Sequence, residues 1–404
     1  MRRGLVALAG FVCMTSIAAA AVGGAGAEAS PSVRTVLGPG VVDTPGGIAL
    51  DAAGNLFVAD TGHCRVLVVP IRSGLFDGRR VRAGRATTLA GGSCTGSGAI
   101  GHPSDVAVDG HGDVFIAEGT AQRVQEIRVA SHRVVTVAGT GTGGFNGDGL
   151  AATASELNQP TGVAVDAAGD LFIADTANCR VRVLPAANAT LFGRAVTAGE
   201  LSTVAGTGVC GSAGQGGPIA AAQLWNPVAV TLDAAGDLLV ADRGDQSILF
   251  APVRGSSFSG SVADSGAIRA GDIGVVMGGS GGYGPYVADG LPAAGSTAEL
   301  NDPRGVTLGP TGALVVTDGF MHAIRVVPAV DQTLLGRAMK QGGLYTLAGA
   351  QPASNAAGTN DGTRWVGTQM GTPVGVAASR SGALYYSDAT ENTVRVIAAG
   401  PASS

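Results

Sequence analysis

The chain repeats one pattern of apolar and polar residues six times. Each repeat begins at a proline, continues as a short apolar run, passes through a turn rich in aspartate and glycine, and ends in a second apolar run closed by an acidic residue. The repeat PTGVAVDAAGDLFIAD shows the pattern most clearly. Short apolar runs separated by turn residues predict β-strands, and a fixed period predicts a repeat architecture. The repeats begin near Pro45, Pro103, Pro160, Pro227, Pro303 and Pro373.

Two further strands follow in most repeats. An apolar residue six positions beyond the closing acidic residue marks a third strand, and a segment such as VVTVAGTG or LSTVAGTG marks a fourth. Four antiparallel strands repeated around an axis form the blade of a β-propeller. The sequence therefore predicts an all-β fold, a six-bladed β-propeller with four antiparallel strands per blade. The third-strand residues are Val66, Val124, Val181, Ile248, Ile324 and Val394.

The sixth repeat lacks a fourth strand at the C-terminal end of the chain. A segment with the fourth-strand pattern, SVRTVLG, stands instead at residues 32–38, before the first repeat. We expect this strand to complete the last blade and close the ring, because closure removes an edge that would otherwise invite aggregation. Residues 30–404 then form a single propeller domain.

The N-terminal residues 1–27 have the three parts of a secretory signal peptide. Arg2 and Arg3 precede a long apolar run, which ends in the small-residue pattern Ala25-Gly26-Ala27, with Ala29 as a second possible cleavage point. This pattern predicts a secreted protein, extracellular or in the cell envelope, with no membrane insertion after cleavage. The alternative is an uncleaved membrane anchor, since the apolar run is nearly long enough to span a bilayer.

Charge argues against a nucleic-acid partner. The formal net charge is −5, and Lys340 is the single lysine of the chain. A nucleic-acid-binding protein needs a basic stripe that displaces counterions from phosphates. No such stripe occurs in this sequence, and we expect a monomer that binds no nucleic acid.

The repeats closely resemble the NHL repeat, whose pattern runs roughly P-x-G-V-A-V-D-x-x-G-N-L-Y-V-A-D-x-x-N-x-R-V. The unit from Pro160 to Val183 matches it almost throughout, and the linker before it, AGTGTGGFNGDGLAATASELNQP, is similar to linkers of secreted bacterial members. The resemblance covers about Val33 to Ile397 and implies the propeller fold. It says little about function, because the family includes interaction modules, sensor ectodomains and a few lyases.

Four of the five cysteines occupy equivalent positions in two repeats. Cys64 and Cys179 follow a closing acidic residue by four positions, whereas Cys94 and Cys210 follow a fourth strand. The turn between strands two and three and the end of strand four lie on the same face of a blade, and strands three and four are neighbours. We therefore predict the disulfides Cys64–Cys94 and Cys179–Cys210. Free thiols or a metal site are the alternatives.

The closing acidic residues could be interpreted as a ring of metal ligands. We favour a structural role, because a residue that recurs in every blade serves the blade. In three blades we expect it to pair with the arginine five positions on, as Arg65, Arg123 or Arg180. The turns in which Asp148, Asp289 or Asp361 precedes a glycine are also more typical of structural turns than of calcium loops. The closing residues are Asp60, Glu118, Asp175, Asp242, Asp318 and Asp388.

The predicted channel offers few groups for chemistry. Its strands are aliphatic, and near its mouth we find His102, Asp105 and Arg304, with Ser104 and Thr161 beside them. These could bind a small anion or polar ligand. They fall short of the several histidines that hold zinc in NHL-like amidating lyases, or of the carboxylates and amides that hold a divalent metal in lactonase-type relatives. We therefore expect no metal and no cofactor.

The long linkers after the fourth and fifth repeats carry Tyr283, Tyr286 and Trp365 in a chain with 4% aromatic residues. Such aromatic side chains suit saccharides and peptides alike. The sequence as a whole favours a non-catalytic binding or scaffold propeller that contacts a protein, peptide or saccharide through its loop face. A metal-dependent lyase or lactone hydrolase with a site in the central funnel is the alternative.

Overall fold

The computed structural model describes residues 32–76, 78–96, 99–254, 268–279, 289–293, 299–335, 337–349 and 370–398. The expected signal peptide, residues 1–27, lies outside these ranges, as do Tyr283, Tyr286, Trp365 and Asp361. In the part of the chain that is described, no helix has the length and apolar character needed to cross a membrane.

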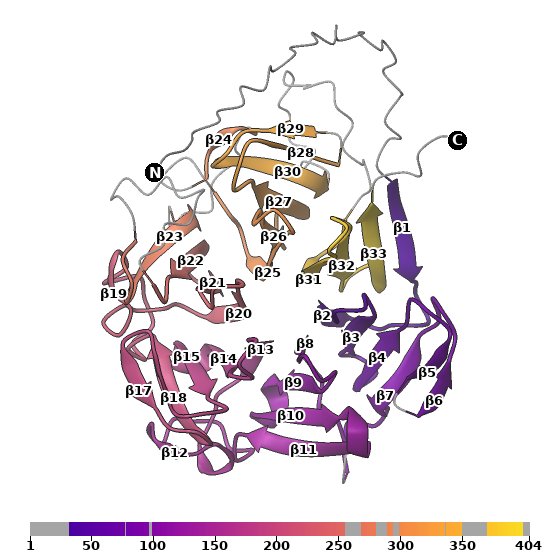
Figure 1. The fold of residues 1–404 in the computed structure, drawn as a ribbon, viewed down its shortest axis with the longest axis horizontal. Coiled ribbons are helices and arrows are strands. Elements are labelled where there is room, and N and C mark those ends of the chain that lie inside the picture. The colour runs from indigo at the N-terminus through magenta and orange to yellow at the C-terminus, as the bar shows by residue number, and fades with distance from the viewer. Residues whose placement is uncertain are drawn as a thin grey trace, which may run out of the picture.

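Six sheets stand around a central axis and form the six blades predicted from the repeats (Figure 1). The innermost strands are β2 (Pro45–Leu50), β8 (Asp105–Val108), β13 (Pro160–Val165), β20 (Pro227–Leu232), β25 (Pro303–Leu308) and β31 (Pro373–Ala378). The second strands are β3 (Leu56–Asp60), β9 (Val114–Glu118), β14 (Leu171–Asp175), β21 (Leu238–Asp242), β26 (Leu314–Asp318) and β32 (Leu384–Asp388). The third strands are β4 (Arg65–Val69), β10 (Arg123–Arg128), β15 (Arg180–Leu184), β22 (Ser247–Ala251), β27 (Ala323–Val327) and β33 (Thr393–Ala398).

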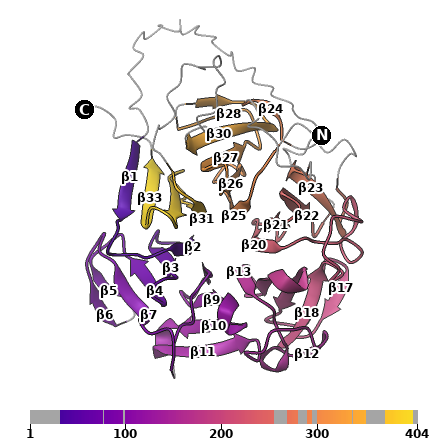
Figure 2. The same ribbon diagram turned by 180° about the vertical axis from the view of Figure 1, so that it is seen from behind.

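The fourth strand of each blade lies at the rim. The first five blades take it from the end of their own repeat. In the sixth blade this place is filled by β1 (Ser32–Leu37), which pairs antiparallel with β33 from Ser32 opposite Ala398 to Leu37 opposite Val394. Figures 1 and 2 show β1 beside β33 from both sides of the ring. The other outer strands are β7 (Thr87–Gly91), β11 (Arg133–Ala138), β18 (Glu200–Ala205), β23 (Asp272–Gly278) and β30 (Gly343–Gly349).

Three blades differ from the predicted four strands, because the linker that enters the blade adds a short fifth strand outside the fourth. These additions are β12 (Leu150–Ala151), β19 (Gly217–Pro218) and β24 (Leu291–Pro292). The hairpins β5–β6 (Gly74–Phe76, Arg79–Val81), β16–β17 (Ala189–Leu191, Arg194–Val196) and β28–β29 (Gln332–Leu334, Arg337–Met339) join third to fourth strands. Single turns of 3-10 helix occur at η1 (Gly119–Ala121), η2 (Val129–Ser131), η3 (Ala152–Ala154) and η4 (Thr176–Asn178).

The hydrophobic core lies between blades rather than within them. The buried apolar side chains form six clusters among the described residues, and each cluster joins two neighbouring blades. Phe172 of the third blade, for example, packs in one cluster with Leu249 of the fourth. This arrangement explains why the strands are apolar on both faces, since each face of a blade covers its neighbour.

Side-chain hydroxyls also join neighbouring blades. Thr61 donates to the carbonyl of Pro103 at 2.6 Å, and Thr176 donates to that of Pro227 at 2.7 Å. The last blade is joined to the first in the same way, because Ser387 donates to the carbonyl of Gly46 at 2.5 Å. Each of these bonds satisfies a carbonyl at or just before the start of an inner strand.

The closing acidic residue of each repeat is buried and holds the end of a linker. Asp60 accepts a hydrogen bond from the backbone N–H of Asp43 at 2.8 Å, and Asp175 accepts one from Asn158 at 2.7 Å. Both donors stand two residues before the proline of the same blade. Burial raises the pKa of Asp242 to about 7, although the N–H of Trp225 opposes that rise. The recurring acidic residue thus connects the linker to the second strand.

Two of the three predicted arginine pairs are present: Arg65 contacts Asp60 and Arg123 contacts Glu118, both at 2.7 Å. The third is wrong. Asp175 is contacted by the buried Arg182 at 3.5 Å, while the guanidinium of Arg180 lies 4.0 Å from the ring centre of Phe145. Residues 180 and 182 share one face of β15, so Arg182 can take the place predicted for Arg180.

The two linker Asp-Gly turns within the described residues, at Asp148 and Asp289, are structural. The carboxylate of Asp148 accepts hydrogen bonds from the N–H and hydroxyl of Thr203, both at 2.9 Å, and lies 3.1 Å from Arg182. Asp289 accepts from the N–H of Thr346 at 2.8 Å and lies 2.7 Å from Arg337. Each aspartate therefore attaches a linker to the outer strand of the blade that follows it.

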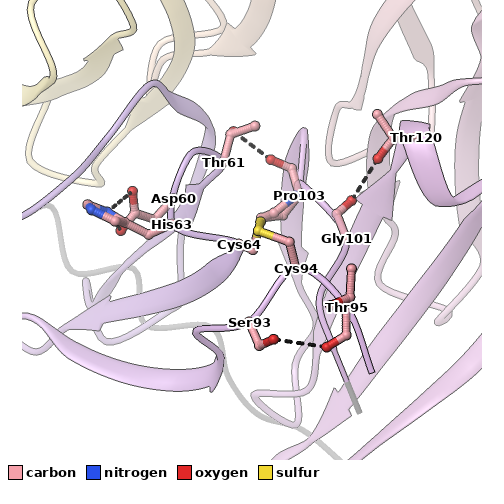
Figure 3. Close-up of a disulfide and its surroundings, with 10 residues drawn as sticks. All are labelled: Asp60, Thr61, His63, Cys64, Ser93, Cys94, Thr95, Gly101, Pro103 and Thr120. Atoms are coloured by element: carbon pink, nitrogen blue, oxygen red, sulfur yellow. Dashed lines mark hydrogen bonds and ion pairs between the residues drawn. A yellow bond between two sulfur atoms is a disulfide. The ribbon is translucent and has the colours of Figure 1, made fainter. Parts of the chain in front are cut away.

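The cysteines form the predicted disulfides. Cys64 is bonded to Cys94 and Cys179 to Cys210, with Cα–Cα distances of 5.1 and 5.3 Å. In Figure 3 the Cys64–Cys94 bond lies close to Pro103, where the second blade begins. Each bond fixes the segment after an outer strand to the turn between the second and third strands.

Replacing Cys64 and Cys94 together by serine should lower the free energy of unfolding by about 3.5 kcal/mol, because the unfolded chain regains the freedom of a loop of about 30 residues. Urea unfolding of the wild type and of the double variant measures this difference. The Cys179→Ser/Cys210→Ser variant is the matched comparison and should lose a similar amount. Peptide mapping that finds a bond between the two pairs would contradict the assignment.

Candidate functional site

The six inner strands surround a central channel that contains a cavity of about 410 Å³. One end opens on what we call the linker face, the face that carries the blade-to-blade linkers and the turns between second and third strands. Of the described residues that line the cavity, three are charged, Asp105, Arg243 and Arg304. Most of the wall is aliphatic, with Ile48, Val106, Val163, Val230, Val306 and Val376.

Asp105 occupies a position that is glycine in four other blades, two residues after the repeat proline. Its carboxylate accepts hydrogen bonds from its neighbour Val106 at 2.9 Å and from Val163 of the next blade at 3.0 Å. On its other side it fills the space over Gly47. Burial raises the pKa of Asp105 to about 7, and the two N–H donors oppose that rise. This carboxylate therefore bridges three blades at the channel.

Arg243 and Arg304 meet at one buried carboxylate on the linker face. Arg243 begins the turn after β21, Asp302 precedes the repeat proline of the fifth blade, and Arg304 follows that proline. The Nε of Arg304 donates to Oδ2 of Asp302 at 2.6 Å, and the Nε of Arg243 donates to Oδ1. Asp302 is 4% exposed, whereas the arginine side chains are 44% and 31% exposed.

Two aromatic side chains stand exposed in the same two blades. Trp225 is 49% exposed and precedes the fourth blade, and Phe320 is 59% exposed in the turn after β26. A Cβ on Gly244, the residue after Arg243, would lie 2.5 Å from Cγ of Trp225. A Cβ on Gly319, the residue before Phe320, would lie 2.5 Å from Oδ2 of Asp302. The missing side chain of Gly244 leaves room for Trp225, and that of Gly319 leaves room for Asp302 and Arg304.

His102 does not lie with Asp105 and Arg304 at the channel mouth, as the sequence analysis expected. It is exposed and is not among the residues that line the cavity. Its ring instead lies beside the Cys64–Cys94 disulfide, with a nitrogen within 4.8 Å of both sulfur atoms. Asp105 and Arg304 do line the same cavity, from the second and fifth blades.

The sequence interpretation missed Arg243, Asp302, Trp225 and Phe320. The signal that could have found them lies in a comparison of the repeats. Positions equivalent to Arg243 hold Thr61, Gly119, Thr176, Gly319 and Ala389, and positions equivalent to Arg304 hold Gly46, Ser104, Thr161, Val228 and Val374. Charge at both positions occurs only where the fourth blade meets the fifth.

The family model of the NHL repeat matches residues 43–69 and 157–184, which lie in the first and third blades. These matches fall on the six-bladed ring described above. The chain carries matches to the NHL repeat and folds as a six-bladed β-propeller.

The protein is similar in sequence to one known protein and in fold to several solved structures. The Arabidopsis thaliana protein SUPPRESSOR OF QUENCHING 1, chloroplastic, is 30% identical over 149 residues, which are 35% of this chain and 14% of that protein. This chain thus matches a minor part of that relative. An auxiliary nutrient binding protein from Bacteroides ovatus superposes with a TM-score of 0.56 at 14% identity, covering 92% of this chain and 77% of that one. A gluconolactonase from Xanthomonas campestris gives a TM-score of 0.50 at 14% identity, covering 92% and 90%.

Proposed function

We propose that this NHL-repeat protein is a secreted binding protein whose ligand or partner contacts the linker face where the fourth and fifth blades meet. The observation that supports the proposal is that Trp225 and Phe320 are exposed in the same two blades whose Arg243 and Arg304 line the channel cavity. Tryptophan and arginine are enriched among the residues that dominate binding energies, and aromatic faces suit peptides and saccharides. The two disulfides fit an oxidising compartment outside the cytosol.

A metal-dependent lyase or lactone hydrolase is the second possibility that the fold allows, since one structural neighbour is named a gluconolactonase and another a nutrient binding protein. The described residues support the binding function. Such an enzyme needs several metal ligands that converge in the channel. Within the described ranges, the group with suitable spacing is Cys64, Cys94 and His102, and its sulfur atoms are bonded to each other. The channel wall itself is mainly aliphatic, which supports binding over catalysis.

An array of defined peptides and oligosaccharides tests this proposal. We expect the purified secreted chain to bind a subset of the array, and the Trp225→Ala/Phe320→Ala variant to bind that subset at least about tenfold more weakly, as expected when anchor residues are truncated. Surface plasmon resonance on the positive probes would measure the ratio.

Leu75 provides the matched control. It is 73% exposed in the hairpin β5–β6, which joins the third strand to the fourth and so lies at the opposite face. Leu75→Ala should bind the positive probes as the wild type does. An array without any bound probe, or equal binding by the aromatic double variant, would refute the proposed surface.

A further inference from the structure

The contact between Arg243, Asp302 and Arg304 departs from what the other blades have at the same place. In the first and third blades, the residue after the closing acidic residue is a threonine that donates to the next blade. In the fourth blade this position is Arg243, which reaches the next blade through Asp302. A residue common to all repeats is explained by the structure of the blade. A pair of arginines that occurs only between the fourth and fifth blades needs a different explanation.

The geometry leaves both guanidinium groups with unused donors. A guanidinium has five N–H donors in a fixed fork, and the contacts to Asp302 use the Nε of each arginine. Within the described residues, the terminal nitrogens of Arg243 and Arg304 have no hydrogen-bond partner in the protein. Asp302 thus fixes the stems of both side chains while their outer edges stay available at the channel mouth.

The charge of this cluster is positive in an acidic protein. Two guanidinium groups face one carboxylate, which leaves a local charge of about +1, whereas the whole chain carries −5. The carboxylate is buried and the guanidiniums are partly exposed, so a ligand meets the positive groups first. Arginine binds a carboxylate through two parallel hydrogen bonds, which adds directional preference to the charge attraction.

The channel beyond the arginines is apolar. Arg304 lines the same cavity as Val306 and Val376, and Arg243 lines it together with Val230. A cavity of about 410 Å³ has the size of a small-molecule site. A ligand whose anionic group contacted the arginines would therefore place its remaining atoms against aliphatic side chains.

We infer that Arg243 and Arg304, both held by Asp302, form an anion clamp that binds the carboxylate of a ligand whose apolar body enters the channel. This inference rests on the proposed binding function and specifies the class of ligand. The carboxylate can belong to a free carboxylic acid or to the C-terminus of a peptide that ends in an apolar residue. Both present the same chemistry to the clamp.

Calorimetric titration at low salt with acetate, butanoate and hexanoate tests the clamp and the channel together. Affinity should rise by about three- to fourfold for each added methylene, because each one leaves water for an apolar wall. A second series uses acetyl-Ala-Leu with a free carboxylate and the same peptide as its C-terminal amide. Binding of the acid but not of the amide would identify a peptide terminus as a suitable source, and binding of hexanoate alone would identify a free acid.

The variants Arg243→Gln and Arg304→Gln should each bind the best carboxylate at least about tenfold more weakly, since each loses a charged hydrogen-bond donor. Arg304→Lys keeps the charge but loses the fork, and it should fall between wild type and Arg304→Gln. Arg128→Gln is the control, because Arg128 pairs with Glu126 on a third strand away from the mouth. Thermal melts check that each variant remains folded.

Equal affinity of the arginine variants and the wild type would overturn the clamp. Sulfate bound as tightly as hexanoate, or equal affinity for acetate and hexanoate, would overturn the apolar part of the ligand. No binding of any carboxylate would also overturn the inference, while leaving the array experiment on Trp225 and Phe320 unaffected. Carboxylate binding without any positive array probe would instead refute the broader surface and retain the clamp.

Discussion

Removal of residues 28–37 should lower the melting temperature by about 6 °C and cause aggregation. The deletion takes away β1, which supplies the outer ladder of the sixth blade, and Leu37, which is 4% exposed in the cluster between the sixth and first blades. A few ladder hydrogen bonds at about 1 kcal/mol each and one buried leucine at about 2 kcal/mol make a loss of roughly 5 kcal/mol. The third strand β33 then becomes an open edge.

Differential scanning calorimetry and light scattering measure these two effects. The matched control is a chain that lacks only residues 28–31 and keeps β1, and its melting curve should equal that of the full secreted chain. If both truncated chains melt alike, β1 does not stabilise the ring.

Gly47→Ala should lower the free energy of unfolding by about 3 to 5 kcal/mol, an effect of overpacking together with the loss of partly buried hydrogen bonds. A Cβ at this position would lie 1.6 Å from Oδ1 of Asp105 and 2.9 Å from its Cα. Asp105 must then move, which breaks its hydrogen bonds to Val106 and Val163. Urea unfolding at equilibrium measures the loss.

A double-mutant cycle shows whether Asp105 is the cause. Asp105→Gly restores the residue that most repeats have at this position, so Gly47→Ala should cost much less in that background. Gly110→Ala is a suitable control, since a Cβ at Gly110 has no atom within 4 Å. Additive effects of Gly47→Ala and Asp105→Gly would show that the two residues do not interact.

The sequence predicts most of the fold because the same pattern of apolar strands and turn residues recurs in every repeat. A single apolar run could belong to a helix or a strand, but the recurrence of proline, aspartate and glycine around each run favours one solution. The short strands β12, β19 and β24 were missed because they lie in the linkers, outside the repeated pattern. Each has two residues in a linker without apolar alternation, and its pairing depends on where the outer strand of the blade lies.

The site is harder to predict, since its members come from different repeats. Asp105 and Arg304 are visible near repeat prolines, and both line the channel. Arg243 is distant from them in sequence, and its role depends on the contact between blades that brings it to Asp302. The predicted aromatic residues Tyr283, Tyr286 and Trp365 fall outside the described residues, and their part in binding stays a prediction.

The closure of the ring by β1 and β33 also affects when the contacts of the fold can form during synthesis. Ser387 and Gly46 are 341 positions apart, and β1 has its partner in the last strand, β33. Contacts between such distant residues form late, because closing a long loop costs entropy before any contact compensates for it. The first strand, β1, therefore stays unpaired until the last strand, β33, has been synthesised. A chain that stops short of β33 is left with an unpaired N-terminal strand and an unclosed ring, rather than a smaller propeller.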